Sequence, residues 1–285
     1  GCGFIGSNFI LRAQKKLDCE ILNIDKLTYS GNIDNLNSVK SKYKFNEADI
    51  SCWKSMKESI KGFEPDYLIN FAAESHVDRS IDSYSEFINT NILGSNNVVN
   101  ASIKNNVQKV VSLSTDKASS PTNLYGATKL CSDKLFVAAN NLIGKKKTRF
   151  SIVRYGNVFN SRGSVVPYYQ SLLDSGQNVL PVTDKKMTRF FISINEGIKF
   201  VIDSMRRMSG GEIFIPKIPS IKILDLAQAM SSKFKIVGIR PGEKIDEVLC
   251  PSDDSHLTIE FKDHYVIAPS IKFYDGRNNY KINKL

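Results

Sequence analysis

Residues 113–129 read LSTDKASSPTNLYGATK, and the interpretation of the whole chain starts from this stretch. Within it, Tyr125 and Lys129 stand four positions apart. On a helix this spacing places the phenol and the ammonium on one face, one turn apart, where the cation can stabilise a phenolate. Tyr125 is therefore a candidate base. The pair alone is weak evidence, because an ordinary surface helix can carry the same two residues.

Thr115, Asp116 and Lys117 precede this helix and directly follow residues 110–113, whose apolar character predicts a buried strand of a parallel sheet. Groups at the carboxyl ends of such strands face the ligand crevice, so we expect this cluster and Tyr125 to meet at one ligand. Side chains alternate along a strand. Asp116 and Lys117 therefore reach the same ligand only if the chain leaves the strand conformation there. A surface ion pair is the other interpretation of these two residues.

The chain begins with GCGFIG, a G-x-G-x-x-G loop formed by Gly1, Gly3 and Gly6. Apolar residues at helical spacing follow, from Phe9 to Leu17, and predict a helix. The N-terminus of a helix after such a loop binds the pyrophosphate of a dinucleotide. The loop functions only where a strand leads into it. We therefore expect that the first strand of the sheet is missing, and that these residues expressed alone fold poorly and retain little cofactor.

A short apolar strand over residues 19–24 ends at Asp25, which lies 19 positions after Gly6. At this spacing an acidic residue binds the ribose 2′-hydroxyl of NAD and would repel the 2′-phosphate of NADP. NAD is therefore favoured, although the neighbouring Lys26 weakens the preference. The other interpretation of Asp25 is a helix cap or a turn residue.

Further cofactor contacts are expected after two more strands. Asp49 and Ile50 follow the next strand and are predicted to lie at the adenine. Residues 66–73 predict a buried strand ending in small side chains, which let a ligand approach the backbone closely. His76 follows, but a single loop histidine is more often structural than catalytic, so it is given no catalytic role. The predicted cofactor set is Gly1, Gly3, Phe4, Ile5, Gly6, Asp25, Lys26, Asp49, Ile50, Phe71, Ala72, Ala73, Tyr125, Lys129 and Val158.

Strands and helices alternate through residue 156, which predicts an α/β protein with a Rossmann-like, doubly wound parallel sheet. Beyond it the elements become shorter, and Pro216, Pro219 and Pro241 interrupt them. We therefore expect a dinucleotide-binding domain at 1–156. A smaller, partly interleaved lobe that binds the substrate is expected at 157–285.

Three arginines of the second lobe, Arg162, Arg189 and Arg240, lie in or beside predicted turns, where binding groups concentrate. Guanidinium groups suit a diphosphate because they bind it in a bidentate manner. A formal charge of +10, from 39 basic and 29 acidic residues, also favours an anionic ligand. The basic residues are scattered and form no nucleic-acid motif, so a nucleotide is favoured over nucleic acid.

The composition, with 41% hydrophobic and 24% charged residues, is that of an ordinary globular protein. The five cysteines are never in C-x-x-C order, which predicts a reduced, cytoplasmic setting and no metal site. No stretch approaches the roughly 18 consecutive apolar residues of a membrane span, so no membrane contact is expected.

These motifs resemble the extended short-chain dehydrogenase/reductase family, specifically its nucleotide-sugar 4,6-dehydratases. Residues 1–82, with GCGFIGSN, NIDKLTYSGN and FAAESHVDRSI, resemble dTDP-glucose 4,6-dehydratases. The sequence from about residue 86 onward, with STDKASSPTNLYGATKLCSDKLFVAANN, RYGNV, MTRFFIS and GIRPGEK, resembles inverting UDP-N-acetylglucosamine 4,6-dehydratases. Either one lineage joins these features or the sequence is a composite. The resemblance also implies truncation at both ends.

For this second group the resemblance implies that Tyr125 takes the C4 hydroxyl proton, Lys117 removes the C5 proton and Asp116 protonates the leaving C6 hydroxyl. Thr115 would hold the C4 oxygen and Lys129 would stabilise the Tyr125 phenolate. The product would be a UDP-4-keto-6-deoxy-L-hexosamine for surface-glycan or pseudaminic-acid-type synthesis. A homo-oligomer is implied as well. The implied nucleotide-sugar contacts are Asn157, Arg162, Val165, Thr183, Arg189, Arg240 and Glu243.

Two departures keep alternatives open. Relatives acting on dTDP-glucose carry Asp-Glu where this chain has Asp116 and Lys117, which favours the acetamido sugar. The inverting relatives resemble NADP users, whereas Asp25 favours NAD. The first competing function is a dTDP-glucose 4,6-dehydratase or a nucleotide-sugar 4-epimerase. Of these, an epimerase needs only Tyr125 and Lys129. The second is a dinucleotide-binding sensor without catalysis. The complete catalytic set speaks against the sensor.

Overall fold

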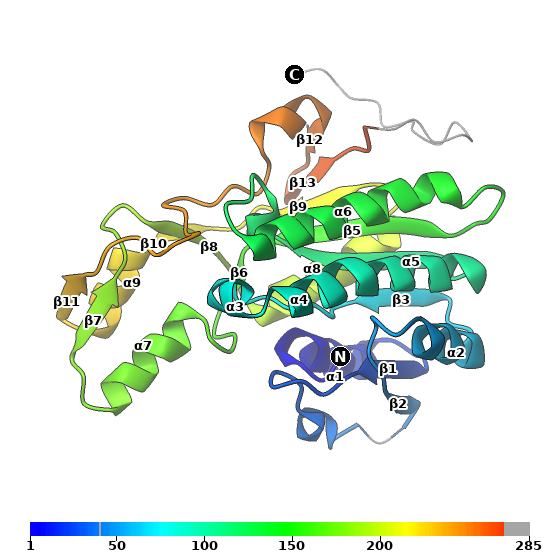
Figure 1. The fold of residues 1–285 in the computed structure, drawn as a ribbon, viewed down its shortest axis with the longest axis horizontal. Coiled ribbons are helices and arrows are strands. Elements are labelled where there is room, and N and C mark those ends of the chain that lie inside the picture. Colours follow the sequence, from blue (N-terminus) through cyan, green and yellow to red (C-terminus); the bar gives the residue numbers. More distant parts are fainter. Residues whose placement is uncertain (40, 271–285) are drawn as a thin grey trace.

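The computed structural model describes residues 1–39 and 41–270. Its largest sheet has six strands in the order β12-β13-β9-β5-β4-β3 (Figure 1). Neighbours among β3, β4, β5 and β9 run parallel. Strand β13 is antiparallel to β9, and β12 is antiparallel to β13. The predicted α/β class is confirmed, with two antiparallel strands added at one edge. The strands are β3 (Tyr67–Asn70), β4 (Lys109–Thr115), β5 (Arg149–Tyr155), β9 (Ile213–Pro216), β12 (Thr258–Glu260) and β13 (His264–Ile267).

Helices cover both faces of this sheet. The helical segments of this part are α1 (Phe4–Lys16), α2 (Trp53–Phe63), α3 (Val77–Asp82), α4 (Tyr84–Phe87), the π-helical η2 (Ile88–Gly94), α5 (Ser95–Lys104), α6 (Leu124–Leu142) and α8 (Ile194–Arg207). Val110 and Ile152 pack with α5 and α6, whereas Val111 and Val153 pack with α1 and α8. Successive residues of a strand point to opposite faces, so the continuous apolar runs of β4 and β5 supply both cores.

The strands β1 (Ile21–Asp25) and β2 (Tyr43–Glu47) form a separate, parallel two-stranded sheet. The short 3₁₀ helix η1 (Ile33–Leu36) lies between them in the sequence. Within the described residues this pair is not hydrogen-bonded to the six-stranded sheet, of which β3 is an outer strand. Figure 1 shows α1, β1 and β2 grouped on the side of β3. The expected strand before Gly1 concerns sequence outside this chain and stays a prediction.

A smaller lobe lies at one end of the molecule (Figure 1). Its apolar core includes Tyr169, Leu180, Val182 and Ile223. Strands after residue 157 also join the large sheet, so the second part of the chain is interleaved with the first. The division into two domains stays a prediction, and its last residues, 271–285, lie outside the described part. The elements of the lobe are β6 (Asn157–Val158), α7 (Val165–Asp174), β7 (Val179–Val182), β8 (Thr188–Ile192), β10 (Ser220–Lys222), α9 (Ile223–Met230) and β11 (Lys233–Ile236).

Two short 3₁₀ helices complete the described fold, η3 (Asp116–Ala118) and η4 (Ser252–Leu257). No helix in the described part of the chain is long and apolar enough to cross a membrane.

Candidate active site

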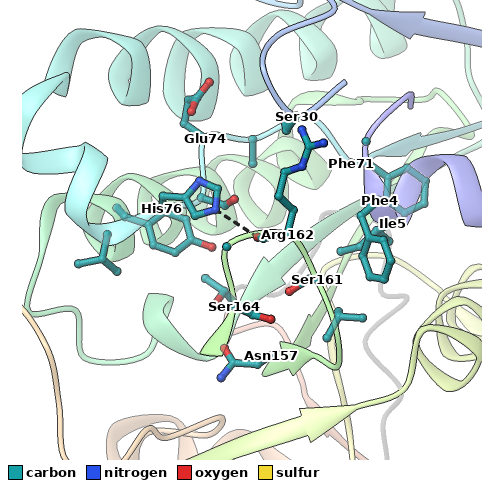
Figure 2. Close-up of a pocket in the computed structure, with 18 of the residues that line it drawn as sticks. Phe4, Ile5, Ser30, Phe71, Glu74, His76, Asn157, Ser161, Arg162 and Ser164 are labelled. Carbon is teal, nitrogen blue, oxygen red and sulfur yellow. Dashed lines mark hydrogen bonds between the residues drawn. The ribbon is translucent and has the colours of Figure 1, made fainter. Parts of the chain in front are cut away.

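One large pocket lies where the loops after β1, β3, β4 and β5 meet the smaller lobe, and its volume is about 1440 Å³. Drug-sized ligands occupy roughly 300–1,000 Å³, so the pocket has room for more than one such molecule. Figure 2 shows Phe4, Ile5 and Phe71 on one side of it, and Asn157 and Ser164 on another. The pocket therefore joins the predicted cofactor loop to the predicted substrate lobe.

Most of the residues predicted from the sequence line this pocket. The exceptions are Asp116 and Lys129, which are buried and do not line it. The lining includes all seven predicted substrate contacts, namely Asn157, Arg162, Val165, Thr183, Arg189, Arg240 and Glu243. It also includes Gly1, Gly3, Phe4, Ile5, Gly6, Asp25, Lys26, Asp49, Ile50, Phe71, Ala72, Ala73, Thr115, Lys117, Tyr125 and Val158.

The glycine loop leaves the start of α1 open to a ligand. Gly3 is the N-cap residue and supplies no side-chain cap, so backbone N–H groups of the first turn are left for other acceptors. A Cβ atom on Gly6 would lie 2.7 Å from the Gly1 backbone, which means that the turn requires glycine there. Backbone N–H groups at a helix N-terminus attract phosphate oxygens. These residues therefore fit the pyrophosphate of a dinucleotide.

Asp25 lies at the end of β1, beside this loop. Its Oδ2 atom accepts the Cys2 N–H (2.7 Å) and its Oδ1 atom accepts the Leu27 N–H (2.9 Å). Burial opposes ionisation, but these N–H groups lower the pKa of Asp25. The carboxylate is therefore ionised and fixed in place at neutral pH. The Gly1 nitrogen also donates to Oδ2 at 2.8 Å, so it is the Oδ1 atom that keeps capacity to accept a further donor.

Lys26, which weakened the preference for NAD, is turned toward other groups. Its Nζ atom lies 3.3 Å from Asp49 Oδ2 and donates to Thr90 Oγ1 at 3.3 Å. A second carboxylate, that of Glu86, lies 3.7 Å away. The positive charge next to Asp25 is thus balanced by carboxylates from two other segments.

The chain leaves β4 at Thr115 and enters η3. The side chains of Asp116 and Lys117 therefore no longer alternate between the two faces of a strand, which was the condition for both to reach one ligand. Lys117 Nζ donates to Asp116 Oδ1 (3.0 Å) and to Asn157 Oδ1 (3.4 Å). Thr115 Oγ1 also donates to Asp116 Oδ1 (2.9 Å). The amine of Lys117 lines the pocket, whereas the carboxyl of Asp116 is fully buried. In this structure Asp116 therefore acts on a ligand only through Lys117 or after a local movement.

Tyr125 is brought to η3 by close packing at the start of α6. Asn123 caps this helix by accepting the Gly126 N–H at 2.8 Å. Gly126 lies against the Lys117 backbone with no space for a side chain. Burial raises the pKa of the Tyr125 phenol, and a hydrogen bond with the Thr115 side chain opposes this rise. Thr115, Lys117 and Tyr125 thus line one pocket, and their catalytic roles stay a prediction.

Lys129 differs from the expectation in its contacts. It is only 4% exposed, and its Nζ atom donates to the Leu113 carbonyl oxygen at 2.7 Å. Burial lowers the pKa of Lys129, while Asp133 opposes that shift. The helical spacing is as predicted, but the structure directs the ammonium to the backbone of β4, and Thr115 is the hydrogen-bonding neighbour of the phenol.

The three arginines line the pocket with different degrees of freedom. Arg189 donates to backbone carbonyls at residues 188, 244 and 245, so its guanidinium is largely committed to the fold. Arg240 forms an ion pair with Glu243 at 2.6 Å. Arg162 donates to the Tyr29 carbonyl oxygen at 2.5 Å, and its own carbonyl oxygen lies 3.4 Å from His76 Nε2 (Figure 2). The three guanidinium groups therefore differ in how many existing hydrogen bonds they would have to give up to bind a diphosphate.

Two features of the site were not predicted from the sequence. Glu247 lines the pocket with its Oε1 atom 3.5 Å from Lys117 Nζ. Beneath α6, Arg154 pairs with Asp133 (3.0 Å), which also accepts the Ser114 hydroxyl (2.7 Å). No sequence motif links Glu247 to Lys117 or Arg154 to Asp133, because only the folding of distant segments brings each pair together. In the described part of the chain, no group of acidic, histidine or cysteine side chains could hold a metal ion.

Fold and site together define an extended short-chain dehydrogenase/reductase: a parallel sheet, a glycine loop at the first helix, and a Tyr-x-x-x-Lys helix at the same pocket. Within this class, residues 1–269 match the model of a family described as "Polysaccharide biosynthesis protein", and the chain belongs to that family.

Two curated relatives, both from Campylobacter jejuni, are named UDP-N-acetylglucosamine 4,6-dehydratase (inverting). The serotype O:2 protein is 56% identical over 222 residues, covering 77% of this chain and 66% of the relative. The serotype O:23/36 protein is 55% identical over 229 residues, covering 80% of this chain and 69% of the relative. The matched part thus spans about two thirds of the length of these relatives.

Solved structures show the same fold. Pen from Bacillus thuringiensis has a TM-score of 0.88 at 30% identity, covering 95% of this chain and 87% of that chain. DesIV from Streptomyces venezuelae, a dTDP-glucose 4,6-dehydratase with NAD and TYD bound, has a TM-score of 0.79 at 25% identity. That match covers 96% of this chain and 92% of DesIV.

Proposed function

We propose that this protein is a C5-inverting UDP-N-acetylglucosamine 4,6-dehydratase. The observation that carries the proposal is the meeting of Tyr125 and Lys117 at one pocket, with Lys117 joined to the buried Asp116 by a 3.0 Å hydrogen bond. An elimination from a sugar needs a base at C5 and an acid at the C6 oxygen, in addition to a base at the C4 hydroxyl. The similarity to relatives of that name supports the same substrate.

The cofactor that we propose is NAD, held by the glycine loop with its ribose at Asp25. The ionised carboxylate of Asp25 would repel a 2′-phosphate, and the Lys26 ammonium is engaged with Asp49. When bound, this cofactor would accept a hydride from C4 of the sugar and return it to C6, so that the reaction involves no net oxidation.

The residues of the chain would then move the protons. Tyr125 takes the proton of the C4 hydroxyl in its phenolate form, which the positive charge of a bound nicotinamide would favour against the effect of burial, while Thr115 holds the oxygen. The resulting ketone acidifies the proton at C5, which the Lys117 amine removes. The C6–O bond breaks, and the leaving oxygen receives a proton from Asp116, which reaches it after a local movement of η3, and departs as water. Once C6 is reduced, a proton added to C5 from the opposite face gives the L-configured product.

The hydrogen bond between Lys117 and Asp116 explains how Lys117 can be an amine and Asp116 a carboxylic acid when the elimination begins. An ammonium beside a carboxylate differs from an amine beside a carboxylic acid by the position of one proton along this bond. Because Lys117 lines the pocket and Asp116 lies beneath it, the pair can hold that proton out of bulk solvent. Asn157, the remaining hydrogen-bond partner of the amine in the described structure, keeps Lys117 directed at the sugar side.

We place the nucleotide and diphosphate in the half of the pocket formed by the smaller lobe. The contacts that we propose there are Asn157, Arg162, Val165, Thr183, Arg189, Arg240 and Glu243, all of which line the pocket. A cytoplasmic homo-oligomer, acting on a nucleotide sugar without nucleic acid or membrane partners, is the setting that we propose for the enzyme.

The test is incubation of a full-length version of the protein with NAD and, separately, UDP-N-acetylglucosamine, dTDP-glucose or UDP-glucose in deuterated water, followed by NMR of the products. We expect dehydration of UDP-N-acetylglucosamine with deuterium at C5. Turnover of dTDP-glucose alone would identify the other dehydratase, and inversion at C4 without loss of water would identify an epimerase. Bound cofactor without turnover would identify a sensor, and each of these three results would overturn the proposal.

A further inference from the structure

A second carboxyl group faces Lys117 and is not part of the mechanism above. Glu247 lies 130 residues away in the sequence, yet its Oε1 atom is 3.5 Å from Lys117 Nζ. Its side chain is 4% exposed, which removes most of the solvent that would screen the charge. Glu247 therefore acts on the charge of Lys117 more strongly than a surface carboxylate would.

Glu247 is in turn balanced by Lys244. The Nζ atom of Lys244 lies 3.5 Å from Glu247 Oε2 and donates to the Ser119 carbonyl oxygen at 2.7 Å. Among the described residues, Glu247 Oε2 and Asp116 Oδ2 are both buried without a hydrogen-bond partner. Buried carboxylate oxygens without donors are costly, so both carboxyls have capacity to accept a further hydrogen bond.

The charged groups that contact Lys117 thus come from two segments: Asp116 from η3, and Glu247 from the segment that also carries Lys244. The titratable Tyr125 of α6 lines the same pocket. Two carboxyls and two ammonium groups form one cluster. The elimination requires the amine form of Lys117, and a carboxylate at 3.5 Å favours the ammonium form. Lys244 weakens that preference because it attracts the same carboxylate.

We propose that Glu247 is a positioning residue, which holds the Lys117 side chain beside Asp116 and, together with Lys244, sets the balance between its ammonium and amine forms. This role rests on the proposed function of Lys117 as the C5 base. It differs from the role of Asp116, because no proton transfer to the sugar is assigned to Glu247.

The test measures the charge of Lys117 without turnover. The folded protein is labelled with trace acetic anhydride, which reacts with amines and not with ammonium groups, across a range of pH. Mass spectrometry then quantifies the acetylated peptide that contains Lys117. In Glu247→Gln we expect half-maximal labelling about one pH unit lower than in the parent protein. In Lys244→Gln we expect a shift in the opposite direction.

Asp246→Asn is the matched control, because its exposed carboxyl accepts the Thr188 hydroxyl instead of facing Lys117. It should leave the labelling curve unchanged. Identical curves for Glu247→Gln and the parent protein would overturn the proposal, as would an equal shift in Asp246→Asn. Circular dichroism checks that each variant is folded. If Glu247→Gln does not fold, Lys244→Gln tests whether the Glu247 carboxylate influences the charge of Lys117.

Parallel turnover assays separate this inference from the proposed function. If the parent protein acts on none of the nucleotide sugars while Glu247→Gln shifts the labelling curve, the dehydratase proposal fails and the charge coupling stands. If the parent protein dehydrates UDP-N-acetylglucosamine and the curve does not shift, the dehydratase proposal stands and the role of Glu247 is wrong.

Discussion

The two halves of the pocket are built from different chemical groups. The half in which we propose the cofactor offers backbone N–H groups at α1 and the Asp25 carboxylate, which two further N–H groups hold, with the Lys26–Asp49 ion pair beside it. The sugar half uses ionisable side chains, with Lys117 near Asp116 and Glu247 and a buried ion pair below α6. Backbone N–H groups are dipoles that do not titrate in the pH range of a folded protein, whereas ionisable side chains exchange protons. The first half is suited to binding and the second to chemistry.

The largest expected effect concerns the buried ion pair of Arg154 and Asp133, which lies between β5 and α6 next to the proposed sugar half. Arg154 and Asp133 are each about 2% exposed and pair at 3.0 Å. In Arg154→Met we expect the free energy of unfolding to fall by about 3–5 kcal/mol, because the Asp133 carboxylate remains buried without its cation. Urea unfolding followed by circular dichroism measures this.

The double variant Arg154→Met/Asp133→Asn is the control for that prediction. It removes both charges and should regain part of the lost stability. If Arg154→Met costs less than about 1 kcal/mol, the range of an exposed ion pair, the sugar half does not depend on this buried pair.

A smaller effect is expected in the cofactor half. Asp25→Asn removes the charge and keeps the shape of the side chain, although its NH2 group replaces one of the two oxygens that accept backbone N–H groups. We expect NAD affinity to fall about tenfold and the preference over NADP to shrink, since the 2′-phosphate is no longer repelled. Isothermal titration with both cofactors measures this. Unchanged affinities for both would show that Asp25 has only a structural role in the turn.

The smallest effect concerns Lys129, whose charge is costly to the fold. Burial lowers its pKa, so the unfolded chain binds a proton more tightly than the folded protein does. Stability is therefore lost as the pH falls from the ordinary lysine value of 10.5 through the lowered one. In Lys129→Met we expect a gain of about 1 kcal/mol at pH 7 with greatly reduced turnover.

Thermal unfolding at several pH values checks this prediction. The difference in Tm between Lys129→Met and the parent protein should narrow as the pH rises toward 10. A large loss of stability at pH 7 would mean that the ammonium contributes to folding, for example through its bond to the Leu113 carbonyl.

The contrast between the halves also explains which residues were predictable from the sequence. The glycine loop and the Tyr125–Lys129 pair depend on local spacing along a helix, so both were visible in the sequence. The position of Lys117 followed from the end of β4. The cluster at Glu247 was not predictable, because it depends on how a segment 130 residues away returns to the pocket.

The direction of a side chain was harder to predict than its position. Helical periodicity placed Lys129 correctly on the face of Tyr125, but the Leu113 carbonyl oxygen accepts its hydrogen bond. Similarly, Asp116 adjoins Lys117 as expected but lies fully buried. Backbone acceptors and burial decide such directions, and neither is encoded in the spacing.

The most direct test of the central claim is a single turnover of UDP-N-acetylglucosamine in deuterated water by the parent protein and by Lys117→Met. The parent should form the 4-keto-6-deoxy product with one deuterium at C5. The variant should still form reduced cofactor, because Tyr125 is intact, but lose water at least a hundredfold more slowly. Dehydration by Lys117→Met at the parent rate, with deuterium still entering C5, would contradict the assignment of Lys117 as the base.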